Sequence, residues 1–159
     1  MSTPTNDAPP SDDLAALRRT VARRHHLVGW TALLLFLSLG TFLEFLLGFK
    51  IGFYMDPGDS HLRRELWRLA HAHGALIGLI HVGFAAGVTQ FGTWTAGRLK
   101  LASFFLIDAA ILIPLGFFLG GVAPSEVDPW IGIVLVPLGA LLLFIAVALV
   151  IASAWNKEG

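Results

Sequence analysis

Five ionisable residues lie within otherwise apolar stretches of the sequence, and they are the candidates for chemistry. They are Glu44, His71, His73, His81 and Asp108. A charged side chain at the centre of a membrane helix costs about 2.5 to 3.5 kcal/mol on insertion scales, so each of these must be paired, neutral or functional. Neutral imidazole is the commonest metal ligand, and histidine also exchanges protons near neutral pH. The sequence therefore predicts a histidine-containing polar site between helices.

The expected depths of these residues in the membrane divide them into an outer and an inner group. At a rise of about 1.5 Å per residue, His71 and His81 are about 15 Å apart along one helix, too far to share one ligand. Counted from the nearest charged helix ends, Glu44 falls at the level of His71, and Asp108 falls close to the level of His81. We expect an outer site that contains Glu44 and an inner polar network or proton relay that contains His81 and Asp108.

The helical angles of the histidines predict how they face. At about 100° per residue, His71 and His81 share one stripe with Gly74 and Gly78, whereas His73 lies about 200° around from His71. The two glycines form Gly-x-x-x-Gly, a spacing that allows a second helix or a flat ligand to approach the backbone closely. We expect Gly74 and Gly78 to form a helix-packing face, through which the chain associates with itself or with a larger complex.

The elements that position these residues are predicted to be membrane helices. The chain has 159 residues, of which 55% are hydrophobic and only 14% charged, far from the composition of a soluble domain. Its apolar runs have the length of about 20 residues that crosses a bilayer and show no strand alternation. The predicted fold is an all-α, polytopic membrane four-helix bundle over 27–154, with helices at 27–49, 66–92, 101–122 and 130–154.

The flanking segments carry polar residues. We expect 1–10 to be disordered, 11–26 to form a basic amphipathic juxtamembrane helix, and 155–159 to be a C-terminal tail. With the N-terminus inside, the inner segments hold seven Lys and Arg residues and the outer segments four, which favours an N-in, C-in topology. Four tryptophans near helix ends are expected as interfacial anchors: Trp67, Trp94, Trp130 and Trp155.

Three interpretations of the histidines stay open. In the first, the polar residues only join helices in a non-enzymatic subunit or scaffold of a membrane complex. In the second, His71, His73 or His81 binds a metal or a haem, with haem b as the implied cofactor in electron transfer. In the third, His81 with Asp108, and His71 or His73 with Glu44, serve a proton- or ion-coupled transporter.

Several function classes lack support. The chain has no cysteine, which excludes disulfides and thiolate chemistry. It has no phosphate-binding loop, dinucleotide fingerprint or serine-nucleophile motif, and a membrane explains its arginine cluster better than nucleic acid does. The expected partners are the lipid bilayer, a second copy of the chain or other membrane subunits, without nucleic acid.

The motifs "LAHAHGALIGLIH", "PLGFFLGG" and "VPLGALLL" resemble those of small bacterial four-helix integral membrane proteins of unknown function. The resemblance covers the second to fourth helices and implies a fold and a bacterial inner-membrane location, but no reaction. The histidines of the second helix are also loosely similar to the haem-ligating second helix of haem-copper oxidases. The chain lacks the further histidines that hold the second haem and copper there, so that catalysis is not implied.

Overall fold

The computed structural model describes residues 10–55 and 59–155, and these residues form helices joined by short loops. The four long helices and two short ones are α1 (Pro10–Gly48), α2 (Gly52–Met55), α3 (Asp59–Gln90), α4 (Ala96–Gly120), η1 (Ile131–Val134) and α5 (Leu135–Trp155). The predicted all-α four-helix bundle is confirmed. Each long helix is long and apolar enough to cross a membrane, so the chain has the architecture of a multi-pass membrane protein. The predicted disordered segment 1–10 and tail 155–159 lie almost wholly outside the described residues.

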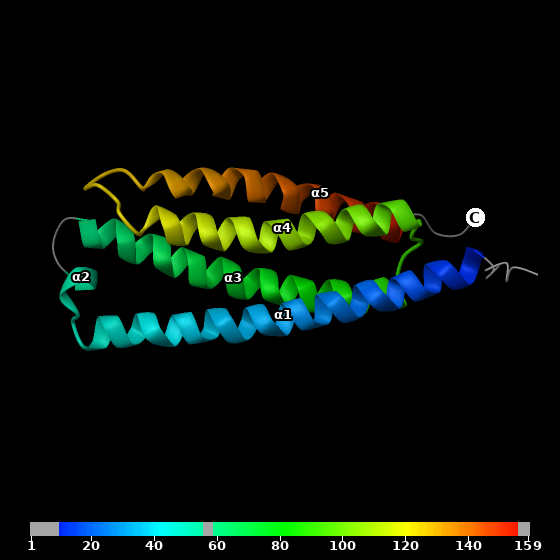
Figure 1. Cartoon of the computed structure of the whole chain (residues 1–159), viewed down its shortest axis with the longest axis horizontal. Coiled ribbons are helices and arrows are strands. Elements are labelled where there is room, and N and C mark those ends of the chain that lie inside the picture. Colours follow the sequence, from blue (N-terminus) through cyan, green and yellow to red (C-terminus); the bar gives the residue numbers. More distant parts are fainter. Residues whose placement is uncertain (1–9, 56–58, 156–159) are drawn as a thin grey trace, which may run out of the picture.

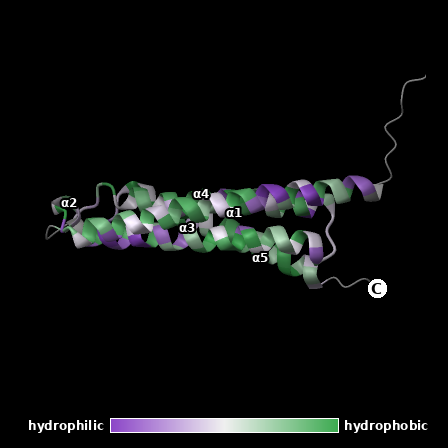
Figure 2. Cartoon of the chain, turned by 90° about the horizontal axis from the view of Figure 1, so that it is seen from below, coloured by the Kyte–Doolittle hydropathy of each residue, from purple (hydrophilic) through white to green (hydrophobic). Residues whose placement is uncertain are grey.

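Helix α1 joins two elements that the sequence analysis separates. The basic segment 11–26 and the first apolar run continue into each other as one helix of 39 residues. Pro10 suits the first helical position because its missing N–H has no helical partner there, and Asp12 and Asp13 in the first turn complement the helix dipole. Figure 2 shows hydrophilic residues gathered at the start of α1 and apolar residues over most of the bundle.

The long helices form two antiparallel hairpins. Helix α1 packs along α3, helix α4 packs along α5, and the hairpins meet through α3 and α4 (Figure 1). Helices α1 and α4 touch only sparsely, and α1 does not contact α5 within the described residues. The bundle is therefore open between α1 and α4. The start of α1 and the end of α5 lie at the same end of the molecule, which we call the basic end.

Glycines bring α1 and α3 into close contact. A Cβ at Gly74 would lie 2.3 Å from the ring of Phe36, and one at Gly78 would lie 3.1 Å from the carbonyl oxygen of Gly29. A Cβ at Gly29 would in turn lie 2.8 Å from the Gly78 oxygen. The Gly74 and Gly78 face is thus occupied by α1 of the same chain. It is not free for a second subunit, contrary to the expectation from the sequence.

The tryptophans differ in their surroundings. Trp94 follows α3 and is only 6% exposed, packed in a core with Phe84 and Val88 instead of lying at the surface. Trp67 donates from its indole Nε1 to the Phe118 carbonyl oxygen at 3.0 Å, whereas Trp130 and Trp155 are exposed. The expected anchoring role therefore does not describe Trp94, because the loop from α3 to α4 folds inward over the bundle.

Candidate functional site: a buried histidine pair

A pair of histidines lies in the half of the bundle nearer the basic end. His25 comes from α1 and His81 from α3, and both side chains are fully buried. Their rings stack with centroids 4.7 Å apart and an interplanar angle of 19°, and their Nδ1 atoms are 2.8 Å apart. One Nδ1 therefore donates a hydrogen bond to the other. The pair joins the two helices at the end of their glycine contact.

A polar chain continues from the pair into α4. The Nε2 atom of His25 is 2.7 Å from Oγ of Ser103, which also accepts a hydrogen bond from the guanidinium of Arg24. At the other end, Nε2 of His81 is 3.2 Å from the backbone oxygen of Leu106. Ser103 is fully buried as well. The chain thus links three helices, from an arginine at one end to a carbonyl at the other.

The two ends of this hydrogen-bonded chain determine which ring nitrogens carry the protons. A carbonyl oxygen only accepts, so Nε2 of His81 carries a proton, and in the neutral ring Nδ1 of His81 is then an acceptor. Nδ1 of His25 must donate to it, which leaves Nε2 of His25 to accept from the Ser103 hydroxyl. All hydrogen bonds point from Arg24 towards Leu106. Two neutral imidazoles in opposite tautomers satisfy every ring nitrogen.

Aromatic and apolar side chains close the site. Phe84 meets the His25 ring edge-on at a centroid distance of 4.6 Å, and Trp94 meets Phe84 in the same way at 5.9 Å. Among the described residues, neither His25 nor His81 lines the apolar cavity around Phe84 and Trp94 or the clefts between α1 and its neighbours. The histidine pair is therefore a closed polar contact inside an apolar core.

Asp108 does not take part in the inner pair, although the sequence analysis placed it beside His81. It is half-buried and lines a cleft between α1 and α4 that also contains Arg24 and Lys100. No ion pair within 4 Å involves Asp108 among the described residues. At the depth where the sequence analysis expected Asp108 to pair with His81, the structure has His25.

The outer level contains His71 and Glu44, as expected, but without a direct contact. Nδ1 of His71 lies 2.6 Å from the Phe36 carbonyl oxygen and donates a hydrogen bond to it, because a carbonyl oxygen only accepts. Glu44 is exposed and lines the same surface cleft as His71 and Arg68. In a neutral His71, Nε2 is therefore unprotonated and keeps a free lone pair.

His73 faces away from the other histidines, as its helical angle predicts. Its Nδ1 is 2.9 Å from the Leu69 carbonyl oxygen one turn earlier, and its ring packs on Phe117 with centroids 4.8 Å apart. These contacts are local to the surface of α3 and the neighbouring α4. They give His73 a packing role.

His25 was not predicted to belong to the inner site, because it directly follows a cluster of four arginines, just before the first apolar run. The signal was nevertheless present. Arg24 and His25 lie at the basic end of α1, and in an antiparallel hairpin that end meets the last third of α3, where His81 lies. Ser103 carried no signal of its own, because a lone serine is common in membrane helices.

The pair in this arrangement does not fit a bis-histidine haem or a metal centre. Its rings stack on each other with no space for a porphyrin, and both Nε2 atoms already have protein partners. Within residues 10–55 and 59–155, no group of three or more His, Asp or Glu side chains is placed to hold a metal ion. His71, in contrast, lines a surface cleft, and its Nε2 has no hydrogen-bond partner among the described residues.

The fold and this site define a class: a four-helix, multi-pass membrane protein with a closed histidine pair between its first and second long helices. Comparison of the chain with protein-family models, with curated proteins and with solved structures finds no match.

Proposed function

We propose that the protein is a non-enzymatic subunit or scaffold of a membrane complex, located in a bacterial inner membrane, in which the histidine pair is a structural contact. The observation that carries this proposal is the complete hydrogen bonding of two fully buried imidazoles. A ligand site or a proton pathway needs an open ring nitrogen, and all four ring nitrogens of the His25–His81 pair have hydrogen-bond partners.

The same geometry argues against a proton relay through the pair. A proton relay needs hydrogen bonds in which donor and acceptor can exchange roles. The hydrogen-bonded chain from Arg24 ends on the backbone oxygen of Leu106, which cannot pass a proton on. Protein reconstituted into liposomes should therefore show no proton flux above that of empty liposomes. Flux that is lost in His81→Ala would overturn the structural role.

The proposal assigns subunit association to α5. This helix has the highest mean hydropathy of the four spans, and Phe144 on its outward face is 75% exposed. Because the chain has no cysteine, single-cysteine variants give clean cross-links. We expect oxidation in native membranes to join two copies of Phe144→Cys by a disulfide, or one copy to a partner subunit that has a cysteine at the contact, while Leu34→Cys, 72% exposed on α1, stays uncross-linked. Equal behaviour of the two variants would contradict this assignment.

A second candidate function, haem binding through one histidine, rests on His71 alone. Its Nδ1 proton is donated to a backbone carbonyl, the contact that usually orients a metal-binding imidazole, and its Nε2 is left for a ligand. Protein purified from haem-supplemented cells should then show a Soret band that His71→Ala abolishes and His81→Ala retains. The absence of a Soret band from the wild-type protein would remove this candidate.

A further inference from the structure

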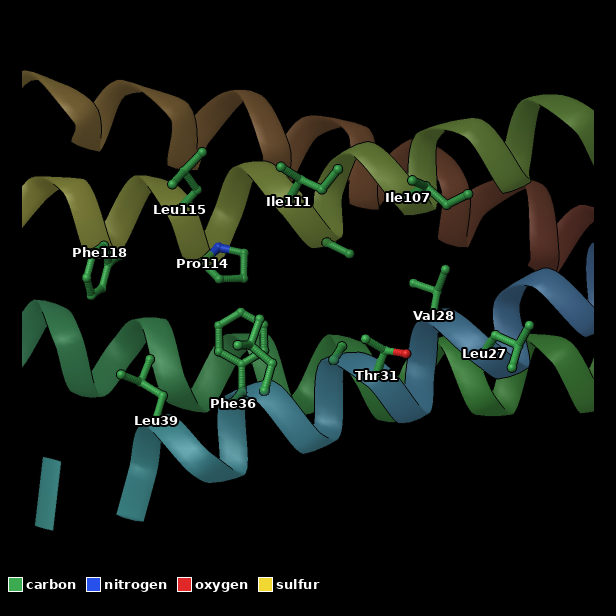
Figure 3. Close-up of a pocket in the computed structure, with 13 residues that line it drawn as sticks. Leu27, Val28, Thr31, Phe36, Leu39, Ile107, Ile111, Pro114, Leu115 and Phe118 are labelled. Atoms are coloured by element: carbon green, nitrogen blue, oxygen red, sulfur yellow. The ribbon is translucent and has the colours of Figure 1, made fainter. Parts of the chain in front are cut away.

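An apolar groove runs along the open side of the bundle, between α1 and α4. Figure 3 shows Leu27, Thr31 and Leu39 of α1 on one side of it and Ile111 and Phe118 of α4 on the other. The cavity has a volume of about 780 Å³, and nearly all of its lining is apolar. It is open because the two helices touch only sparsely.

The groove is as long as one leaflet of a bilayer. From Leu27 to Leu39 is twelve residues, or about 18 Å along the helix axis. Half of a hydrocarbon layer of about 30 Å is about 15 Å. A lipid chain that enters from the basic end would therefore lie along the groove over its whole length.

The end of the groove nearer the basic end opens into a charged cleft. Ile107 lines both cavities, and beyond it the cleft is bordered by Arg24, Lys100 and Asp108. Two cations and one carboxylate leave one net positive charge. A phosphodiester carries one negative charge, so the charge of the cleft matches that of an anionic phospholipid headgroup.

We propose that this groove and cleft form a binding site for one anionic glycerophospholipid, with its phosphodiester between Arg24 and Lys100 and an acyl chain between α1 and α4. The site differs from the histidine pair in its position and in the ligand that it would hold. Arg24 is the one residue that they share, because its guanidinium also donates to Ser103.

The two signs of charge in the cleft predict opposite effects on lipid binding for two substitutions. Lys100→Gln should weaken the binding of phosphatidylglycerol about fivefold, because one basic residue near an anionic headgroup contributes roughly that much. Asp108→Asn should strengthen it by a similar factor, since it removes the carboxylate from the same cleft. Arg98→Gln is the matched control, because Arg98 is exposed on the same helix but does not line the cleft.

Native mass spectrometry of the full chain, titrated with phosphatidylglycerol or phosphatidylcholine, measures these changes. The wild-type protein should prefer phosphatidylglycerol, and filling the groove with Thr31→Trp should reduce binding, whereas Leu34→Trp on the outer side of α1 should not. Equal binding of both lipids would overturn the proposal. So would an effect of Arg98→Gln equal to that of Lys100→Gln, or equal binding of glycerol phosphate, which has no chain to fill the groove.

Discussion

Replacing Ser103 by alanine should destabilise the bundle although it removes a single atom. The Oγ atom accepts from Arg24 and donates to Nε2 of His25, so Ser103→Ala deletes both contacts and leaves a buried acceptor without a donor. Hydrogen bonds between membrane helices contribute about 0.6 kcal/mol on average and up to about 1.7 kcal/mol. An unsatisfied buried polar group costs about 1 to 3 kcal/mol. We expect the free energy of unfolding to fall by about 1 to 2 kcal/mol.

The measurement is reversible unfolding in mixed micelles, followed by steric trapping or by denaturing detergent. Ser38→Ala is the matched control, because the Ser38 hydroxyl donates only to Leu34 of its own helix and is exposed. That variant should change the free energy of unfolding by less than about 0.5 kcal/mol. If Ser103→Ala and Ser38→Ala have the same small effect, the polar chain does not stabilise the packing of α1, α3 and α4, and the reasoning is refuted.

Three further predictions follow from the packing. Gly29→Ala should lower the free energy of unfolding by about 1 to 3 kcal/mol, because its Cβ would lie 2.8 Å from a backbone oxygen of α3. Gly83→Ala is the control: its Cβ would meet nothing within 4 Å, so the free energy of unfolding should stay unchanged or rise by up to about 1 kcal/mol. The same unfolding assay measures both variants. Trp94→Phe should cost no more than about 1 to 2 kcal/mol, the packing lost with the smaller ring, since the buried Nε1 has no hydrogen-bond partner among the described residues; a clearly larger loss than that would contradict an unbonded indole N–H. Glu44→Gln should change thermal stability little, because Glu44 is exposed and forms no ion pair within 4 Å among the described residues; a marked loss would indicate a pair with Arg68.

Periodicity and length were enough to predict the helices, because hydrocarbon forces the backbone to satisfy its own hydrogen bonds and leaves few alternatives. The opposite facing of His73 also followed from the helical angle. The close approach of a second helix to Gly74 and Gly78 was expected, but the sequence did not predict that this helix would be α1. Spacing shows that a glycine face can accept a helix, and only tertiary packing decides that α1 of the same chain fills it.

The partner of His81 in the inner site could not be predicted from the sequence for the same reason. Depth along a helix places residues within a few ångströms, but it does not say which way a neighbouring helix turns its side chains. Asp108 is near the expected depth yet lines the cleft between α1 and α4, while His25 occupies the interior. A juxtamembrane arginine cluster is normally explained by membrane topology. The histidine next to this cluster was therefore not predicted to lie inside the bundle.

The tautomers of His25 and His81 test the central claim most directly. Solid-state ¹⁵N NMR of histidine-labelled protein in lipid bilayers distinguishes protonated from unprotonated ring nitrogens, and His25→Phe and His81→Phe assign the signals. The closed chain predicts two neutral rings, with the proton on Nδ1 in His25 and on Nε2 in His81, and a coupling between the two Nδ1 atoms across their hydrogen bond. Two rings in the same tautomer without that coupling, or ring nitrogens shifted by a bound metal, would contradict the account.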